Sequence, residues 1–596
     1  MSETRVDAEP SRADPAQEHG THPRPPAAHV VHRGPGPLDR AGLRWLRVDG
    51  LGLAVGVAFG SLAMTPSLIP RDWFVQGLAT GLSAAVGYGV GTVLWFLMRR
   101  TRVGIRLFAR ARARVPARVR LAAWPILLVA AAVVVLVMLV AGAQWQRDIA
   151  LLVGIEPPTL LGYARAVPLG VLVAAAPIAV VRLVRHADHL LVRGLRRYAH
   201  LPRRIAGAVA VVLLAMVIAA VVNQIVLRGT LTVVDQAFSG VNDETYPGFD
   251  RPTSPTRSGS PASLVPWETL GKEGRRFVAA GRDAATLAAA GGRPAVEPVR
   301  AYVGLETATE PQARADLAVR ELEREGAFSR PVVAVVTTTG TGWVDDPVAD
   351  SLEALYAGDS AIVATQYSYL PSWLSFLFDG PRAEEAGRLL IDAVHARIQA
   401  IPPGVPRPRM IVFGESLGSQ GSEGAFSSLA DVRANTDGVL WVGPPNSNRL
   451  WSQIVTRRDP GSPEVLPTYS DGLVVRFAGG PSTAAVAQNP STPWIAPHVL
   501  YLQHPSDPVV WWSPDLLWER PDWLVEPRGS DVVGAMSWYP VITFWQVSID
   551  LVNAVNVPPG HGHVYTDEIL DGWVAVAAPP GWTAADTARV RQALAG

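Results

Sequence analysis

The sequence predicts an α-helical membrane domain followed by an α/β domain with a mostly parallel, doubly wound sheet. Long uncharged apolar stretches are confined to about the first 230 residues. After residue 296, apolar strand-length segments alternate with amphipathic helical segments, and a Gly-x-Ser-x-Gly motif stands between one strand and the next helix. The composition agrees, because 48% hydrophobic against 18% charged residues over 596 positions is too apolar for an ordinary soluble enzyme.

Charge and cysteine content exclude several classes of function. The formal net charge of +1 argues against nucleic acid as a partner, and the basic runs that do occur lack interleaved aromatic residues. The chain contains no cysteine, which excludes disulfides, thiol catalysis and cysteine-ligated metal sites.

Residues 1–45 are rich in Pro, Arg, His and Ala and show no apolar periodicity. Such a segment cannot close a hydrophobic core, so we expect a disordered polar tail. It does not resemble a secretory signal, because no apolar stretch begins before Leu51.

Residues 46–230 are predicted to form a membrane domain of about five helices. Four stretches lack charged residues and approach the length of about 20 residues that crosses a bilayer as a helix. These stretches are Leu51–Ile69, Phe74–Met98, Leu121–Ala143 and Ile205–Leu227. Ala166–Val181 is a fifth candidate, but it is shorter and contains Pro168 and Pro177, so a re-entrant or interfacial helix is the alternative.

Arginine placement predicts the orientation of these spans. The connections after Met98 and after Val181 are rich in arginine, whereas Pro70–Trp73 and Gln144–Arg165 contain few basic residues. Basic connections favour the cytoplasmic side, although the same arginines would also suit a helical face that binds anionic lipid headgroups. Five crossings with a cytoplasmic N-terminus satisfy all four connections. The sequence therefore predicts a multi-pass protein of the cell membrane with an extracytoplasmic C-terminal domain.

Residues 231–295 are predicted to be a linker and lead-in to the catalytic domain at 296–596. Phe238–Ser263 is dense in Ser, Pro, Thr, Gly and Asp, which is typical of an irregular linker.

The C-terminal domain alternates predicted strands and helices, as a parallel α/β sheet requires. The predicted strands are Val299–Gly304, Pro331–Val336, Ser360–Gln366, Met410–Phe413, Gly438–Val442, Leu473–Phe477 and His498–Leu502. The predicted helices are Pro311–Glu325, Pro347–Ala357, Arg382–Ile401, a segment after Ser416 that continues through Glu423–Leu429, and Asp567–Ala575.

Ser416 is the predicted nucleophile, because it lies between Gly414 and Gly418 where a strand turns into a helix. A serine on such a tight turn needs small neighbours, and the turn leaves the amide of Leu417 free to bind an oxyanion. The motif alone also occurs by chance, so the prediction of a nucleophile depends on whether the chain also supplies an acid and a base.

The Gly- and Thr-rich loop after Pro331–Val336 is a candidate for the second oxyanion donor. In a doubly wound sheet, the loop after an early strand can present an amide to the same oxyanion as the residue after the nucleophile. We expect this amide from Thr339, Gly340 or Thr341, and an ordinary tight turn is the alternative.

Asp507 is the predicted acid, because it stands in the turn just past the strand His498–Leu502. In the α/β-hydrolase order the triad follows as serine, acid and histidine. Asp515 and Asp471 are weaker candidates, since neither directly follows so clear a strand. A structural role as a turn residue before Pro508 is the alternative for Asp507.

The predicted base lies in the loop that contains His561 and His563. Flanking glycines make this loop able to bring an imidazole over the serine, whereas His395, His498 and His504 suit packing or surface roles. We choose His563, which is closest to the following helix, and keep His561 as the alternative. Two histidines at this spacing also suit a metal, but the loop offers no acidic third ligand.

The chain resembles a known family through several segments taken together. These are the multi-span N-terminal half and the segments TTTGTGWVDDP, GDSAIVATQYSYLPSW, VFGESLGSQG, LQHPSDPVVWW and PPGHGHVY. They are similar to the actinobacterial membrane-anchored α/β-hydrolase family of unestablished substrate. The resemblance implies an α/β-hydrolase fold with Ser416, Asp507 and one of the two loop histidines as a catalytic triad. It implies no substrate.

These observations predict a membrane-anchored serine hydrolase, esterase- or lipase-like, that needs no cofactor or metal and acts on an ester or thioester at the extracytoplasmic face. A lipid-linked ester is the first candidate, because tryptophan suits both an acyl pocket and a membrane interface, although core packing explains these residues equally well. The tryptophans are Trp343, Trp373, Trp511, Trp512, Trp518, Trp523, Trp538 and Trp545. The alternatives are an envelope acyltransferase with the same triad and a non-enzymatic membrane or transport protein.

Overall fold

The computed structural model describes residues 48–102, 106, 117–221, 240–371, 374–376, 379–480, 483 and 493–595. Asp49–Gly596 cluster into one compact unit. The predicted polar tail at 1–45 and Trp373 lie outside the described residues.

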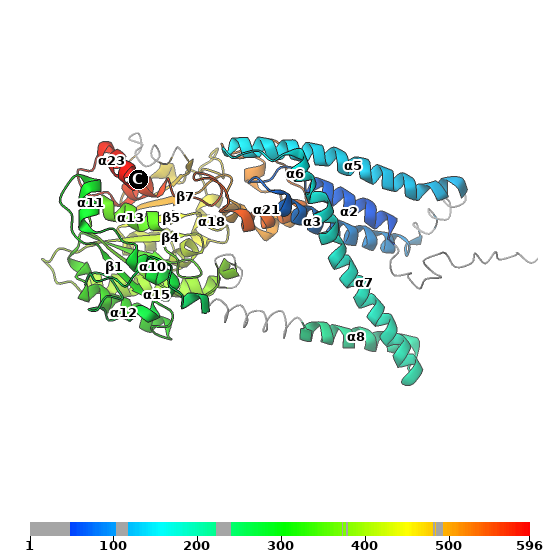
Figure 1. Ribbon diagram of the computed structural model, residues 1–596, viewed down its shortest axis with the longest axis horizontal. Helices are drawn as coiled ribbons and strands as arrows, with labels where there is room; N and C mark the ends of the chain where they lie inside the picture. Colours follow the sequence, from blue (N-terminus) through cyan, green and yellow to red (C-terminus); the bar gives the residue numbers. More distant parts are fainter. Residues whose placement is uncertain are drawn as a thin grey trace, which may run out of the picture. The chain divides into compact units, whose positions relative to one another are not determined.

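The N-terminal part consists of apolar helices (Figure 1). They are α2 (Gly50–Leu62), α3 (Trp73–Met98), α5 (Ala117–Leu152), the short α6 (Leu160–Ala164), α7 (Ala166–Tyr198) and α8 (Arg203–Val221). Among the described residues, four stretches are long and apolar enough to cross a membrane, namely Trp73–Met98, Ala122–Leu152, Leu160–Tyr198 and Arg203–Val221.

A continuous helix contains the fifth predicted span, whereas the first predicted span ends earlier than expected. Ala166–Val181 belongs to the continuous helix α7, which accommodates Pro177 in its interior, so the structure contains no re-entrant break there. Conversely, Leu51–Ile69 is not one helix, because α2 ends at Leu62 after 13 residues. Pro66 explains this end, since proline lacks an amide donor and disfavours helical backbone in the residue before it.

Glycines allow α3 to pack closely on two neighbouring helices. A Cβ at Gly91 would lie 2.7 Å from the carbonyl oxygen of Leu51 in α2. On another face of α3, a Cβ at Gly81 would lie 2.7 Å from the carbonyl oxygen of Gly170 in α7. Small residues at intervals of four let helix backbones approach each other in a membrane, where no hydrophobic effect drives helices together.

The C-terminal part is built on a seven-stranded sheet with the order β1-β3-β2-β4-β5-β7-β6, in which every pair of neighbours is parallel. The strands are β1 (Val299–Val303), β2 (Val332–Thr337), β3 (Ala361–Thr365), β4 (Arg409–Glu415), β5 (Gly438–Val442), β6 (Val475–Ala478) and β7 (His498–Leu502). All seven predicted strands are present, and their near-continuous apolar runs are fully buried as parallel strands require.

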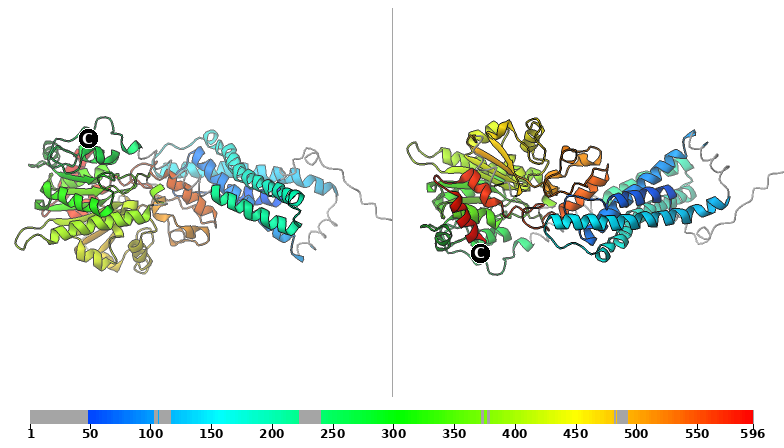
Figure 2. Two further views of the ribbon diagram at one scale, coloured as in Figure 1. Left: turned by 90° about the horizontal axis from the view of Figure 1, so that it is seen from below. Right: turned by 90° about the horizontal axis from the view of Figure 1, so that it is seen from above.

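Helices cover both faces of this sheet (Figures 1 and 2). One layer contains α12 (Pro311–Arg324), α15 (Gly380–Gln399) and α16 (Leu417–Glu423), and the other contains α13 (Asp346–Leu355) and α22 (Ile569–Ala577) with α11 (Ala284–Gly291) and α23 (Ala584–Leu594) outside them. The predicted class, apolar membrane-length helices followed by a doubly wound α/β domain, is confirmed.

The remaining helices occupy connections. They are α10 (Gly271–Ala279), α17 (Leu429–Asn435), α18 (Arg449–Thr456), α20 (Pro508–Trp511) and α21 (Ile542–Asn553), with short 3₁₀ turns at Trp267–Thr269, Ala327–Ser329, Ser470–Gly472, Pro514–Leu517 and Asp522–Leu524. The helix predicted to continue through Glu423–Leu429 is interrupted, because α16 ends at Glu423 and the side chain of Ser428 caps α17 by accepting from the amide of Asp431.

The described part of the predicted linker packs against the sheet. Its backbone is irregular, but the amide of Ser258 donates to the carbonyl of Arg300 in β1 at 3.0 Å, and the Ser258 hydroxyl accepts from the amide of Tyr302 at 3.0 Å. Arg257 and Ser258 are buried. Residues 254–263 are therefore an edge of the α/β domain as well as a connection.

We predict that Gly91→Leu destabilises the protein while Gly89→Leu does not. The added side chain at Gly91 meets only α2 backbone, and overpacking of this kind costs about 1–3 kcal/mol. A Cβ at Gly89, on the same helix, has no heavy atom within 4 Å. The melting temperatures of the two variants in detergent provide the comparison, and equal values would contradict close packing of α2 on α3.

Candidate active site

Ser416 lies at the tight turn between β4 and α16. Its φ of 53° and ψ of −126° occupy a region that residues with a side chain rarely adopt. A Cβ at Gly414 would lie 2.3 Å from the carbonyl oxygen of Gly418, and one at Gly418 would lie 2.3 Å from the carbonyl oxygen of Thr337. Both glycines are therefore required by close backbone approach, and the turn has the geometry that the motif predicts.

The amide of Leu417 is the first donor of α16, so it has no acceptor within the helix. Because Gly418 contacts the end of β2, the loop after β2 lies beside this amide. Within that loop the amide of Thr339 donates to the carbonyl of Trp343 at 3.3 Å. Of the three predicted loop donors, Thr339 is therefore already engaged, and Gly340 and Thr341 are the better candidates.

Asp507 is fully buried at the carboxyl end of β7, where it caps α20. Its Oδ1 accepts from the amide of Val509 at 2.8 Å, and its Oδ2 accepts from the hydroxyl of Tyr565 at 2.7 Å. His563 Nδ1 lies 2.7 Å from the same Oδ2. A buried carboxylate is costly unless it is hydrogen-bonded, and these three donors satisfy it.

The imidazole of His563 packs against the strand end beside Ser416. A Cβ at Gly443 would lie 2.4 Å from Cε1 of His563, and the preceding residue, Val442, accepts the amide of Ser416 at 2.8 Å. Within the described residues, Nε2 of His563 is buried and has no hydrogen-bond partner. The hydrogen bond between Ser416 and His563 is therefore not formed here, which is common in active sites without substrate.

The other predicted alternatives lie elsewhere. His561 Nδ1 is 3.4 Å from Oδ2 of Asp531 rather than near Asp507. Asp515 and Asp471 are exposed on the surface. The structure thus brings together Asp507 and His563 next to the turn of Ser416, and it directs His561 to a different carboxylate.

The two loop histidines do not converge on a metal site. Across the residues that the structure describes, no group of three or more His, Cys, Asp or Glu side chains is arranged to hold a metal ion. Each of the two imidazoles instead has a separate carboxylate partner.

Tyr565 was not identified from the sequence as a functional residue. Its hydroxyl donates to Asp507 and accepts from the backbone amide of His504 at 3.0 Å. Its ring stacks on the imidazole of His504, with ring centroids 4.0 Å apart. The only signal for this role is its position two residues after His563 in the same loop.

A buried carboxyl group next to Ser416 is a second feature that was not identified from the sequence. Burial raises the pKa of Glu415 well above its usual value, and the charges of Asp345 and Asp507 raise it further. Burial, followed by the charge of Asp346, also raises the pKa of Asp345 to about 7. A neutral Glu415 adds no competing negative charge beside the pair formed by Asp507 and His563.

Two family models match the chain. The model described as the alpha/beta-hydrolase family matches residues 299–590, and the one described as the N-terminus of that family matches residues 64–281. The chain belongs to this alpha/beta-hydrolase family. No curated protein and no solved structure matches it. Membership indicates hydrolase-type activity, while the actinobacterial source and membrane anchoring implied by the resemblance stay predictions.

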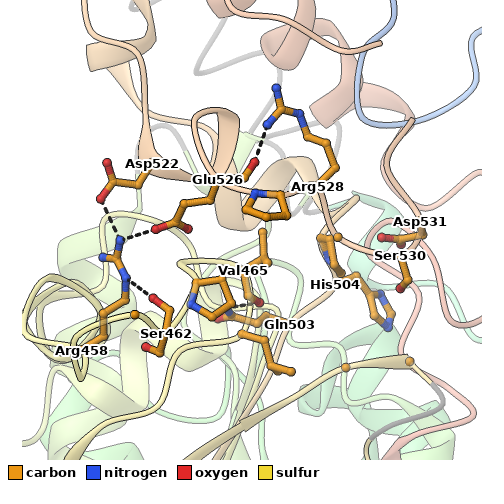
Figure 3. Close-up of a pocket in the computed structure, with 18 of the residues that line it drawn as sticks. Arg458, Ser462, Val465, Gln503, His504, Asp522, Glu526, Arg528, Ser530 and Asp531 are labelled. Carbon is orange, nitrogen blue, oxygen red and sulfur yellow. Dashed lines mark hydrogen bonds and ion pairs between the residues drawn. The ribbon is translucent and has the colours of Figure 1, made fainter. Parts of the chain in front are cut away.

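The protein has a cavity of about 950 Å³ that borders the histidine loop (Figure 3). His504, Asp531 and His561 line it at one side, and Arg458, paired with Asp522 and Glu526, lines it at another. Ser416, Asp507 and His563 are not among its lining residues. The cavity is therefore separate from these three side chains.

The tryptophans of the C-terminal domain divide between core and loops. Trp511 and Trp523 are fully buried in the core, and Trp518 is 65% exposed. Trp512 and Trp545 are half-buried, and Trp545 belongs to α21. Part of the aromatic content predicted to bind an acyl chain is therefore core packing.

His504, predicted to be a packing or surface residue, is fully buried and pairs with Glu568 at 2.7 Å between Nε2 and Oε1. Burial lowers the pKa of this imidazole, but the hydrogen bond and charge of Glu568 outweigh that effect and raise it. His498 stacks on Trp494, and His395 lies on the surface.

We predict that Glu568→Gln destabilises the protein more at pH 6 than at pH 9. A histidine pKa raised on folding contributes stability below its unfolded value of about 6.5, and that contribution disappears as the pH rises through the folded pKa. At pH 6 the loss should be about 1.5–3 kcal/mol, as for hydrogen bonds to charged groups. Thermal melts at both pH values measure this loss of stability, with Asp515→Asn at an exposed position as the control. An equal loss of stability at pH 6 and pH 9 would refute the charged pair.

Proposed function

We propose that this protein is a membrane-anchored serine hydrolase of carboxylic esters or thioesters, with Ser416, Asp507 and His563 as its catalytic triad. One observation carries the proposal. His563 bonds the buried Asp507 through Nδ1 at 2.7 Å and keeps an unpartnered, buried Nε2 beside the strained turn of Ser416. A base oriented by a carboxylate, with its other nitrogen free next to a serine elbow, is the arrangement that acyl transfer through serine needs.

In the first half of the reaction, Oγ of Ser416 attacks the carbonyl carbon of the substrate while Nε2 of His563 takes the hydroxyl proton. The amide of Leu417 and an amide of Gly340 or Thr341 stabilise the oxyanion. The tetrahedral intermediate then collapses, the bond to the leaving oxygen or sulfur breaks, and the leaving group takes the proton from His563.

In the second half, water attacks the acyl group on Ser416 and passes a proton to His563. The bond between Oγ and the acyl carbon breaks, the carboxylic acid leaves, and the proton returns to Oγ. Asp507 orients the imidazole throughout and stabilises its charged form. Tyr565 holds Asp507 in place through its hydroxyl.

A lipid-linked ester is the substrate class that the aromatic residues favour. Half-buried rings follow one another from the catalytic loops to α21, with centroids 5.8 Å apart for Phe376 and Trp512, 5.9 Å for Trp512 and Phe544, and 5.3 Å for Phe544 and Trp545. Ser375, just before this row, contacts Gly340 of the oxyanion loop, and α21 packs on the apolar helix α3. Aromatic surfaces of this kind suit an acyl chain that enters from a membrane.

The same contacts support an extracytoplasmic catalytic domain in a multi-pass protein of the cell membrane with a cytoplasmic N-terminus. The connection between α2 and α3, predicted from its few basic residues to lie outside, contacts the catalytic domain. There the side-chain amide of Asn553 donates to the carbonyl of Pro70 at 3.1 Å. Whichever side holds this connection therefore also holds the catalytic domain.

We predict that a fluorophosphonate probe labels the wild-type protein in membranes and does not label Ser416→Ala. His563→Gln should lower the labelling rate by at least about 1,000-fold, because the serine then lacks its base. His561→Gln, two residues away and bonded to Asp531, is the matched control and should label at close to the wild-type rate. Gel fluorescence with time gives these rates. An unlabelled wild-type protein, or equal labelling of Ser416→Ala, would exclude a serine hydrolase.

We also predict that protease added to intact spheroplasts of an expressing bacterium removes the catalytic domain. Starting from the connection between α2 and α3, predicted to lie outside, the four membrane-length helices α3, α5, α7 and α8 return the chain to the outer side. Antibodies against tags at the two termini follow the cleavage, and permeabilised cells show that the cytoplasmic tag is itself cleavable. A C-terminal domain that resists protease until the cells are permeabilised would overturn the proposed orientation.

A further inference from the structure

The segment between α2 and α3 is part of the core of the catalytic domain. Leu68 and Ile69 are completely buried, and both belong to the same hydrophobic cluster as the central strands of the sheet. α21 lies beside α3 in the fold (Figure 1). The membrane part of the chain therefore reaches into the catalytic domain at α21.

A buried ion pair anchors this segment. Arg71 Nε lies 2.6 Å from Oδ1 of Asp550 in α21, and both side chains are 0% exposed. Arg71 Nη2 also donates to the carbonyl of Gln546 at 2.8 Å, one turn earlier in α21. The hydroxyl of Ser67 and the amide of Leu68 donate to the other oxygen of Asp550. These directional hydrogen bonds fix the segment against one turn of the helix.

The end of α21 leads directly to the histidine loop. Ala554, the residue after α21, accepts the backbone amide of His563 at 2.9 Å. A Cβ at Gly562 would lie 2.7 Å from that same carbonyl oxygen and 3.6 Å from Cγ2 of Ile69. The loop that carries His563 is therefore held between the end of α21 and the segment that precedes α3.

We propose that Arg71 and Asp550 are positioning residues for His563, and that the membrane hairpin α2–α3 thereby sets the geometry of the active site. The inference rests on the proposed triad. The ion pair fixes α21, α21 fixes the carbonyl of Ala554, and that carbonyl fixes the backbone of His563. The pair acts through this chain of contacts and does not touch the substrate.

An ion pair between Arg71 and Asp550 that only stabilised the fold would affect turnover differently. Replacing a buried ion pair by apolar residues of similar size is often neutral for stability, whereas removing one partner leaves an unpaired buried charge. A double replacement therefore separates positioning from stability. If the pair only stabilises, Arg71→Leu combined with Asp550→Leu leaves catalysis nearly intact; if it positions His563, the protein folds but its turnover falls.

The experiment measures kcat and KM for hydrolysis of p-nitrophenyl butyrate by the full-length protein in detergent. We expect the Arg71→Leu/Asp550→Leu variant to lose about 10- to 100-fold in kcat with little change in KM, as for a misplacement of a catalytic group by about 1 Å. The matched control is Arg300→Leu/Glu353→Leu. That pair is equally buried, with Nε and Oε1 2.6 Å apart, but it joins β1 to α13 away from the histidine loop, so kcat should change little.

The decisive readout is the same double replacement in a His563→Ala background. A change that acts through His563 lowers kcat no further when the imidazole is absent, whereas a partly unfolded protein loses the residual activity by the same factor. Equal losses in the two backgrounds, or an unchanged kcat in the presence of His563, would overturn the inference.

Arg71→Lys provides a second test that does not depend on the double variant remaining folded. Lysine keeps the charge but lacks the fork that bonds Asp550 and Gln546 together, so we expect a smaller loss that also vanishes in the His563→Ala background. Full activity of Arg71→Lys and of a folded double variant would refute the positioning role and leave the proposed function intact. Absence of Ser416-dependent hydrolysis in the wild-type protein would instead refute the proposed function.

Discussion

The burial of the Asp507 carboxylate is the constraint on which the rest of the site depends. A carboxylate taken out of water costs several kcal/mol unless donors replace the water, and here the donors come from Val509, Tyr565 and His563. Two of these belong to a loop more than 50 residues further along the chain. Satisfying one buried charge therefore closes the loop over the end of β7, and this closure brings the imidazole to the turn of Ser416.

Elements whose residue pattern is set by nearby contacts could be predicted from the sequence. β7 was predicted at its observed bounds because a parallel strand buried on both faces is a continuous apolar run, and Asp507 followed from the turn after it. The tight turn at Ser416 could be predicted because it needs glycine at positions 414 and 418. Close backbone contacts within a few residues, and with one neighbouring strand, leave no room for a side chain there. Local constraints of this kind leave their mark on the sequence itself.

Long-range pairing could not be predicted. His561 and His563 share one loop, and they differ only in whether Asp531 or Asp507 lies opposite, which depends on how distant segments pack. Tyr565 and the pair of His504 with Glu568 were missed for the same reason. The predicted end of the span Leu51–Ile69 was wrong for a related reason, because hydropathy does not distinguish Leu68 and Ile69 in a protein core from residues in lipid.

The same two residues explain why the apolar N-terminal helices and the α/β domain are not independent parts. The family model for the N-terminus begins at Met64, just after α2 ends, and so includes the whole segment that packs on α21. Without that segment, Asp550 would lose the guanidinium of Arg71, and the surfaces that bury Leu68 and Ile69 would be left open next to Gly562. An α/β domain cut from its apolar N-terminal helices would thus keep the tight turn at Ser416, which depends on the sheet, but would lose the support of the loop that carries His563.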